Sequence, residues 1–413
     1  MTNPAPLNVL HWNFGILNDV KFDRLRKSGI LINNKKKANP SLKLANTSRG
    51  TQDTFVKFND LVGRNVKRLE AYYDYIMPKQ IIYLNIYLQK TCDLESLTLN
   101  FRGGREFTDS RLIALGHALK ALHCLKVLDI EITEPKRISD KGFYKFAAGL
   151  INLNQLRSFS FSVDLCHVTD ISVGKLAKSI GYFSELRSLD LILMRFAELK
   201  GKALSVLAYN IQKLNKLESF ILDLSWCRNI AEESLIELND ALSSMKTLKE
   251  YSLTCRKCSI SDNTITSFAR MLGNLPELHS LRLDMYGCTN INEESLCELF
   301  KNLAIMKSIR KISLYLGPGG HLESSFGDVG MEMLGNALKN FEHLKEFKST
   351  FCEFKNLSDE GIQKLGKAVT NLKELEIMEI RFSFCEGISK EGLCSLGQLI
   401  STNPSVSQVY LAQ

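Results

Sequence analysis

No stretch of this 413-residue chain is apolar over the roughly 20 residues that a membrane-spanning helix requires. The segment from Met1 to Pro6 lacks the charged and apolar regions of a secretory signal. The first 20 residues also contain no Lys or Arg, in contrast to an organelle presequence. We therefore expect no membrane span, no secretion signal and no presequence.

Catalytic motifs are also missing from the sequence. The seven histidines are scattered, and none belongs to a nucleophile motif or has the spacing of metal ligands. We therefore expect a protein that is not an enzyme and that carries no cofactor.

The eleven cysteines show no disulfide pattern. Their number is odd, and a chain of this size does not need covalent crosslinks, so we expect a reducing, intracellular location, most simply the cytoplasm. Cys255 and Cys258 have the spacing of half a zinc site, but no second pair lies at zinc spacing. We therefore interpret them as two core residues and expect no bound metal.

The sequence does contain an internal repeat. Residues Leu217 to Cys227 read L-x-x-F-x-L-x-L-x-x-C. With Leu217 as position 1, the same phase occurs eleven times, in steps of 30 or 31 residues with one step of 35. The first positions are Leu94, Leu125, Leu156, Leu186, Leu217, Leu248, Leu278, Ile309, Leu344, Leu375 and Val406. A period this regular indicates a solenoid.

Each repeat has the pattern of a strand followed by a helix. Apolar residues at positions 4, 6 and 8 alternate with polar ones, as in Leu189, Leu191 and Leu193, which is typical of a half-buried strand. A hydroxyl or amide residue follows and is often succeeded by an acid, as in the I-S-D stretch that begins at Ile138. The first can cap a helix and the second favours the positive helix end. Apolar spacing of three or four residues then predicts the helix itself.

This unit resembles the leucine-rich repeat of the ribonuclease-inhibitor-like type, which is abundant in unicellular eukaryotes. The resemblance covers Leu94 to Gln413 and rests on L-x-x-L-x-L-x-L, on Cys at position 11, and on I-S-D-x-G at Ile138 to Gly142. It implies an α/β horseshoe of about eleven repeats, with a parallel sheet on the concave face and helices on the convex face. These motifs specify a fold and not an activity, and the family's usual mode of action is protein–protein interaction.

Charge separates the repeats from what precedes them. Residues 1–93 hold 15 basic and 7 acidic residues, whereas residues 94–413 hold 38 of each, from totals of 53 and 45. The whole net charge of +8 therefore lies before the repeats.

We expect three parts: a basic, extended arm at 1–53, a helical cap at 54–93, and the repeat domain at 94–413. Within the cap, the sequence predicts one helix over Phe55 to Leu69 and another after Pro78. The arm is either solvated or an anchor on an acidic partner or a nucleic-acid backbone. The anchoring residues would be Lys35, Lys36, Lys37, Lys43 and Arg49.

Positions 3, 5 and 7 of each strand should face the concavity. They are acidic early in the arc and gain basic residues late. Lys and Arg do not follow the groove together with aromatic residues, so we expect nucleic acid to bind only through the arm. The face is either merely solvated or an interaction surface. Its candidate interaction residues are Asp129, Glu131, Asp190, Asp223, Arg282, Asp284, Tyr315, Lys348 and Arg381.

The function that the sequence favours is a non-enzymatic scaffold or adaptor that binds a protein partner on its concave face. The alternative is a structural subunit of a large assembly, anchored by the basic arm to nucleic acid or to an acidic protein surface. An enzyme inhibitor is a further alternative by fold analogy alone. Since the last strand, which begins near Val406, is followed by no helix before Gln413, we also expect another chain or a second copy to cover that edge.

Overall fold

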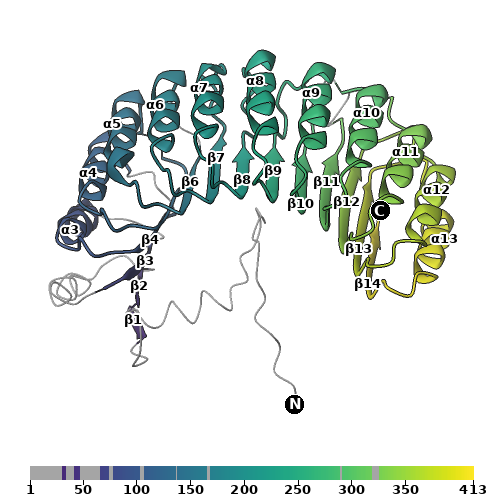
Figure 1. The fold of residues 1–413 in the computed structure, drawn as a ribbon, viewed down its shortest axis with the longest axis horizontal. Coiled ribbons are helices and arrows are strands. Elements are labelled where there is room, and N and C mark those ends of the chain that lie inside the picture. The colour runs from purple at the N-terminus through teal and green to yellow at the C-terminus, as the bar shows by residue number, and fades with distance from the viewer. Residues whose placement is uncertain are drawn as a thin grey trace.

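The chain folds into an open arc, with one long β-sheet on the inside and a row of helices on the outside (Figure 1). The computed structural model describes residues 30–33, 41–46, 66–73, 78–102, 107–135, 137–164, 168–288, 291–318 and 325–413. The 14 strands of the described sheet follow one another in chain order. β1 and β2 pair antiparallel, and every later pair is parallel.

Strands and helices alternate along the chain from β3 onward. The strands are β1 (Ile30–Asn33), β2 (Ser41–Asn46), β3 (Arg68–Tyr73), β4 (Ser96–Phe101), β5 (Val127–Ile132), β6 (Ser158–Asp164), β7 (Ser188–Met194), β8 (Ser219–Asp223), β9 (Glu250–Thr254), β10 (Ser280–Asp284), β11 (Lys311–Leu316), β12 (Glu346–Cys352), β13 (Ile377–Ser383) and β14 (Gln408–Ala412). The helices are α3 (Pro78–Gln89), α4 (Asp109–Leu119), α5 (Asp140–Gly149), α6 (Asp170–Ile180), α7 (Lys202–Ile211), α8 (Glu232–Ser243), α9 (Asp262–Gly273), α10 (Glu293–Leu303), α11 (Asp328–Leu338), α12 (Asp359–Val369) and α13 (Lys390–Ser401), and a 3₁₀ turn, η2 (Leu150–Asn152), follows α5.

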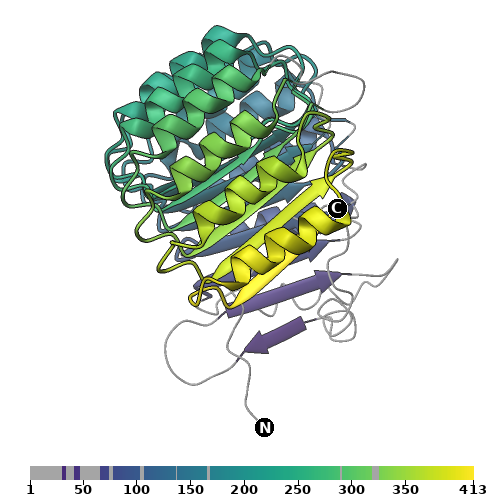
Figure 2. The same ribbon diagram turned by 90° about the vertical axis from the view of Figure 1, so that its right-hand side faces the viewer.

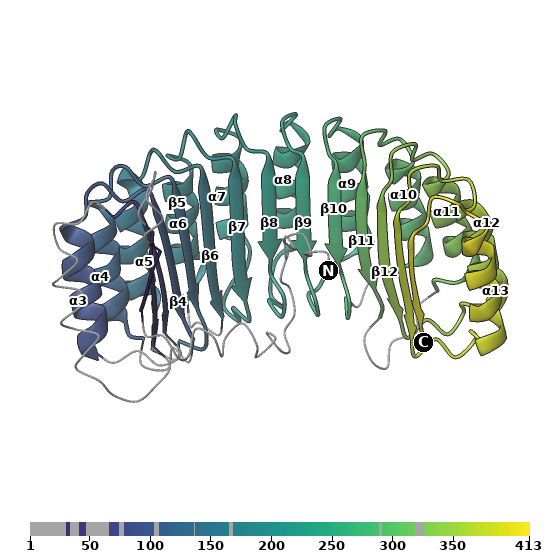
Figure 3. The same cartoon turned by 90° about the horizontal axis from the view of Figure 1, so that it is seen from below.

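The sheet and the helices form two curved layers that do not close into a barrel. The side view shows the helices on one face of the sheet (Figure 2), and the view from below looks onto the bare inner face (Figure 3). This confirms the predicted α/β solenoid, with a parallel sheet on the concave face and helices on the convex face.

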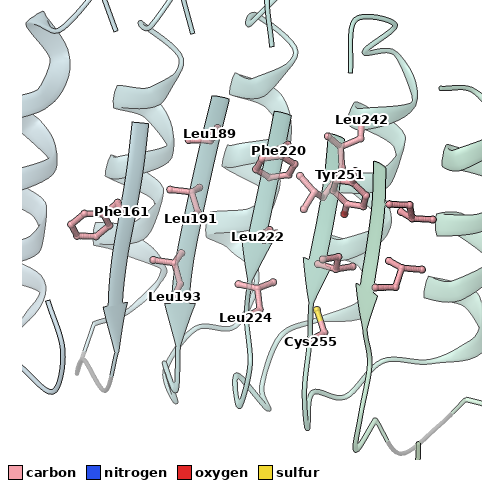
Figure 4. Packing of buried hydrophobic residues seen from close by; sticks show 14 of the residues in the cluster. Phe161, Leu189, Leu191, Leu193, Phe220, Leu222, Leu224, Leu242, Tyr251 and Cys255 are labelled. Carbon is pink, nitrogen blue, oxygen red and sulfur yellow. The ribbon is translucent and has the colours of Figure 1, made fainter. Parts of the chain in front are cut away.

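Alternate residues of each strand form the core. In β5, Leu128, Ile130 and Ile132 are at most 1% exposed, whereas Asp129 and Glu131 between them are half-buried on the other face. The close-up shows the same inward side chains on β7, where Leu189, Leu191 and Leu193 face the helices (Figure 4). Since neighbouring strands pair without offset between equivalent positions, each concave position forms a straight row across the sheet.

Cysteines at position 11 contribute to this core. Cys227, Cys258, Cys288 and Cys385 are buried, and each thiol donates to a backbone carbonyl of the preceding repeat, as in Cys258 Sγ to Leu224 O at 3.0 Å. Burial raises the pKa of Cys227 to about 12 and that of Cys385 to about 11. Cys255 is also buried, and both members of the Cys255–Cys258 pair lie in the core. These thiols act as small, weakly polar packing groups.

The region before Leu94 differs from the expected helical cap. The predicted helix from Phe55 to Leu69 is wrong at its end, because Arg68–Tyr73 forms strand β3. Leu69, Ala71 and Tyr73 are buried in alternation, and this period of two fits a strand rather than a helix. With α3, which does follow Pro78 as predicted, β3 makes one more strand–helix repeat at the start of the row.

The expected arm also contributes to the sheet. Its described residues form β1 and β2, and β2 pairs parallel with β3 from Ser41 opposite Arg68 to Asn46 opposite Tyr73. Lys43 belongs to β2, whereas Lys35, Lys36, Lys37 and Arg49 lie outside the described residues. The sheet therefore begins within the segment that we expected to be a separate arm.

A carboxylate in the first turn of one helix caps the next helix. Asp359 of α12 accepts hydrogen bonds from the backbone N–H of Ser389 at 2.8 Å and from its hydroxyl at 2.5 Å, just before α13. Asp109, Asp140, Asp170, Asp262, Glu293 and Asp328 accept backbone N–H groups of the following repeat in the same way. Each carboxylate thus satisfies N–H groups that have no partner within their own helix.

The glycine of the I-S-D-x-G motif provides the space for this contact. A Cβ atom at Gly361 would clash with Asp328, and one at Gly392 would clash with Asp359. Glycine at these two positions lets the carboxylate of the preceding repeat approach the helix N-terminus closely. The motif therefore describes a contact between repeats and not only a local cap.

We predict that Asp359→Ala lowers the free energy of unfolding of the C-terminal repeats by about 1–3 kcal/mol, because it leaves the N–H of Ser389 and its hydroxyl without their acceptor. The measurement is urea unfolding combined with hydrogen exchange of the α13 amides. Glu360→Ala is the matched control, since the Glu360 side chain is 73% exposed and pairs with Lys364 within the same helix. Equal effects of the two substitutions would contradict the capping role.

Candidate functional site

The concave face is acidic over its N-terminal half. Within the described sheet, strands β4 to β9 place no Lys or Arg at positions 3, 5 and 7. We call the carboxylates of these strands the acidic half-arc: Asp129, Glu131, Asp190, Asp223 and Glu250. The preceding strand, β3, places both Arg68 and Glu70 in the same rows. The carboxylates of the half-arc lie on a rigid surface, because each strand is fixed by the register of its neighbours.

Asp190 on β7 is the carboxylate whose charge is most disfavoured. Burial, then the nearby charges of Glu250 and Asp129, raise its pKa to about 7. A hydrogen bond from the hydroxyl of Ser188 partly offsets this rise in pKa. The buried Oδ1 atom of Asp190 has no hydrogen-bond partner among the described residues. Near neutral pH, this side chain lies between its two charge states and would gain from a positively charged partner.

Asp129 and Glu131 on β5 form the neighbouring part of the half-arc. Burial raises the pKa of both carboxyl groups. Asp129 accepts a hydrogen bond from Ser160, and the amide of Asn100 donates to Glu131 at 2.5 Å. Neutral hydroxyl and amide donors hold these two carboxylates in place, and the charge of Arg102 partly compensates that of Glu131.

Asp223 on β8 has a more structural environment. It is only 4% exposed and accepts a hydrogen bond from the backbone N–H of Ser225 at 2.8 Å. Burial raises the pKa of this carboxyl as well. Asp223 therefore shapes the turn at the end of β8 and adds negative potential, but it offers little surface for direct contact.

The C-terminal half of the concave face carries charges that pair with one another. Asp284 is 1% exposed and accepts from Arg256 Nε at 2.8 Å, and Arg282 lies 3.8 Å from the same carboxylate. The guanidinium of Arg282 also lies 4.4 Å from the Tyr315 ring centroid. Arg282, Asp284 and Tyr315 thus form one local network together with Arg256.

The last two basic candidates also have partners nearby. Lys348 lies 2.5 Å from Glu346, and Arg381 lies 2.9 Å from Glu379 and 4.7 Å from the Tyr410 ring centroid. Most of the charge in this half is therefore already neutralised. The unbalanced charge of the concave face lies in the acidic half-arc.

A second set of exposed residues follows the strand ends. Arg195, Trp226, Lys257 and Phe384 all have a left-handed backbone, with φ between 54° and 66°, which is uncommon outside glycine. In Arg195, Trp226 and Lys257, the backbone N–H donates to a carbonyl of the next repeat and continues the ladder, as in Trp226 N to Arg256 O at 2.8 Å. The Trp226 ring lies 4.4 Å from the Lys257 ammonium group. Arg195, Trp226 and Lys257 follow β7, β8 and β9 and border the acidic half-arc, whereas Phe384 follows β13 near the other end of the sheet.

The structure brings together some predicted site residues and separates others. Asp129, Glu131 and Asp190 share one surface with Glu250, whereas Asp223 lies beside it and is buried. The other five predicted residues, Arg282, Asp284, Tyr315, Lys348 and Arg381, belong to the paired half. The prediction from the sequence covered only positions 3, 5 and 7 of each repeat. It therefore missed Arg256 at position 9 and Trp226 at position 10, which follow their strands. The repeat register alone would have been enough to find them.

Two kinds of feature are absent from the described residues. The described part of the chain contains no helix that is both long and apolar enough to cross a membrane. In the same residues, no three His, Cys, Asp or Glu side chains are grouped so that they could hold a metal ion. No protein-family model matches the sequence, and no curated protein is significantly similar to it.

We predict that Asp190→Asn stabilises the protein at about pH 8 and has little effect at about pH 4. Burial raises the pKa of Asp190 from the ordinary value of 3.8 to about 7 in the folded protein. Between these two pH values, the folded chain therefore binds more protons than the unfolded chain. The wild type therefore loses stability as the pH rises from about 4 to 7, whereas Asp190→Asn does not, because asparagine carries no titratable group.

The measurement is the melting temperature of both proteins across this pH range, with an expected gain of roughly 2 °C or more for Asp190→Asn at the upper end. Asp240→Asn, at an exposed position on α8, is the control. If Asp190→Asn raised the melting temperature by the same amount at every pH, the raised pKa of Asp190 would be wrong.

Proposed function

We propose that this protein is a non-enzymatic scaffold that binds a Lys- or Arg-rich segment of a protein partner in the acidic half-arc. The observation that carries the proposal is the set of half-buried carboxylates Asp129, Glu131 and Asp190, which are held by neutral donors and of which only Glu131 is stabilised by a nearby cation among the described residues, Arg102. A folded protein keeps such groups at a cost to its own stability, because burial disfavours their charged forms. A cationic ligand would reverse this cost and gain charge-assisted hydrogen bonds.

The form of the surface also suits a segment of protein chain. The arc presents rows of side chains across many strands, and its concave face is extended rather than a closed pocket. Solenoids commonly use such surfaces to bind other proteins. We further propose that the repeat is of the leucine-rich, ribonuclease-inhibitor-like type and that the protein acts inside the cell, most simply in the cytoplasm, where the buried thiols stay reduced.

The test is affinity capture from native lysate with three proteins: the wild type, the concave variant Asp129→Asn/Glu131→Gln/Asp190→Asn, and a convex control. The control, Glu233→Gln/Glu237→Gln/Asp240→Asn, removes the same number of charges from exposed positions of α8. We expect the concave variant alone to lose the partner, with an affinity at least about tenfold lower, since several charge-assisted contacts are removed.

The recovered partner should contain a basic segment, and its binding should weaken with added salt because the contacts are electrostatic. Equal recovery of the same partner by all three proteins would show that the acidic half-arc is not the recognition surface.

A second candidate function rests on the charge asymmetry of the sequence, whose net excess of +8 lies within residues 1–93. In this case the protein is a structural subunit of a large assembly, anchored by its basic N-terminal segment to nucleic acid or to an acidic protein surface. Because β2 is paired with β3, substitution is a cleaner test than truncation.

We expect Lys35→Ala/Lys36→Ala/Lys37→Ala to abolish salt-sensitive co-sedimentation with large assemblies if this second function holds, because phosphate-type contacts depend on each cation. The concave variant serves as the control and should leave co-sedimentation unchanged. If the lysine variant sediments as the wild type does, the anchoring function is wrong.

A further inference from the structure

The outer faces of three neighbouring helices, α5, α6 and α7, together with the turns after α6 and α7, combine lysines with exposed tyrosines. Tyr144, Tyr182 and Tyr209 are 40%, 58% and 67% exposed, and they supply three of the four exposed tyrosines among the described residues. The lysines are Lys141, Lys145, Lys175, Lys178, Lys202 and Lys213. These helices lie next to one another on the convex side of the arc (Figure 1).

A groove runs between α6 and α7 on this surface. Its volume is about 610 Å³. Its charged and aromatic lining consists of Lys175, Lys178, Lys213, Tyr182 and Tyr209. Cations and aromatic rings are therefore presented together, within a space large enough for a base and its phosphate.

The rings and ammonium groups are organised with respect to each other. The ammonium group of Lys213 lies 4.4 Å from the centroid of Tyr209, and that of Lys175 lies 5.7 Å from the centroid of Tyr144. Lys213 also donates to the side chain of Asn210 at 3.0 Å. Such contacts restrict the side chains and lower the entropy lost when a ligand binds.

Acidic side chains do not neutralise this surface. The acids within α5, α6 and α7 are Asp140 and Asp170, and both accept backbone N–H groups of the following repeat. Glu185, in the turn after α6, lies 2.6 Å from the ammonium group of Lys216. The next helix, α8, instead exposes Glu233, Glu237 and Asp240. The positive surface therefore has a sharp boundary at α8, which would repel an anion placed beyond it.

We propose that the groove between α6 and α7, together with the lysines of α5, binds single-stranded nucleic acid. Lysines contact the backbone phosphates, and bases stack on Tyr182 and Tyr209. An acidic peptide would satisfy the lysines but would leave the exposed rings without a role, whereas any base offers a π-face to them. This surface is on the opposite side of the sheet from the acidic half-arc, so the inference does not depend on the function proposed above.

The test is fluorescence anisotropy with the full chain and a fluorescein-labelled single-stranded oligonucleotide of mixed sequence, about 16 nucleotides long. The groove variant is Lys175→Ala/Lys178→Ala/Lys213→Ala. Its matched control is Lys301→Ala/Lys339→Ala/Lys367→Ala, which removes exposed lysines from the C-terminal ends of α10, α11 and α12. We expect the groove variant to bind about tenfold or more weakly and to lower the salt slope by about 2, since each phosphate contact contributes about 0.7.

Two further proteins test the stacking. Tyr182→Ala/Tyr209→Ala should bind about tenfold or more weakly, whereas Tyr182→Phe/Tyr209→Phe should stay within about twofold of the wild type, because phenylalanine keeps the ring. A polyglutamate peptide at equal charge should compete poorly with the oligonucleotide.

Several results would overturn the proposal. The full chain could fail to bind the oligonucleotide, or binding could depend on Lys35, Lys36 and Lys37 and not on the groove lysines. Equal competition by polyglutamate, with no effect of the alanine substitutions at the tyrosines, would assign the surface to an acidic peptide instead.

Discussion

The stacking of the repeats depends on a contact in which an acidic side chain in the first turn of one helix caps the next helix. The carboxylate accepts the N-terminal backbone N–H groups of that helix, as Asp328 does for Ser358 at 2.8 Å. A helix end left without such partners would bury unsatisfied donors. Since the capping carboxylate belongs to the neighbouring repeat, seven of the described helices (α5, α6, α7, α10, α11, α12 and α13) gain this cap only when the repeats are stacked. Before α8, the N–H of Ala231 donates instead to the backbone carbonyl of Lys200 in the preceding repeat.

This arrangement separates structural residues from those available for recognition. The core uses one face of each strand and the inner stripe of each helix, and the caps use the first helical turn. Concave positions 3, 5 and 7 and the outer faces of the helices are left with few structural duties. The concave face and the outer helix faces carry opposite charge over the same repeats. Carboxylates such as Asp190 lie inside the arc on β7, and lysines such as Lys178 lie outside it on α6. A single rigid body can therefore present two chemically distinct faces over the same repeats.

Most of the fold was predictable from the sequence because its period is strict. The phase set by Leu94 and Leu125 places their strands in direct register, with Ser96 opposite Val127. The pattern did not identify the repeat that contains β3, because its first position lies 28 residues before Leu94 and is Val66 instead of leucine. The capping aspartates were recognised as helix-start residues, but their partners lie about 30 residues away in the chain, and a local pattern does not reveal such a contact. The pairing of charges was not predictable, because it depends on neighbours in three dimensions. Among the described residues, Asp190 has no cation beside it, whereas Arg256 neutralises the charge of Asp284.

Photo-crosslinking from within the concave face tests the proposed recognition surface most directly. Ser160 lies between Asp129 and Asp190 in the same row of the sheet, so benzoylphenylalanine at this position reports on any chain that occupies the acidic half-arc. Ser313, on the later half of the concave face, and Gln212, exposed at the end of α7, are the reference positions. We expect a crosslink from position 160 to a basic segment of a partner protein and none from positions 313 and 212. Crosslinks from position 313 or 212, with none from position 160, would contradict recognition by the acidic half-arc.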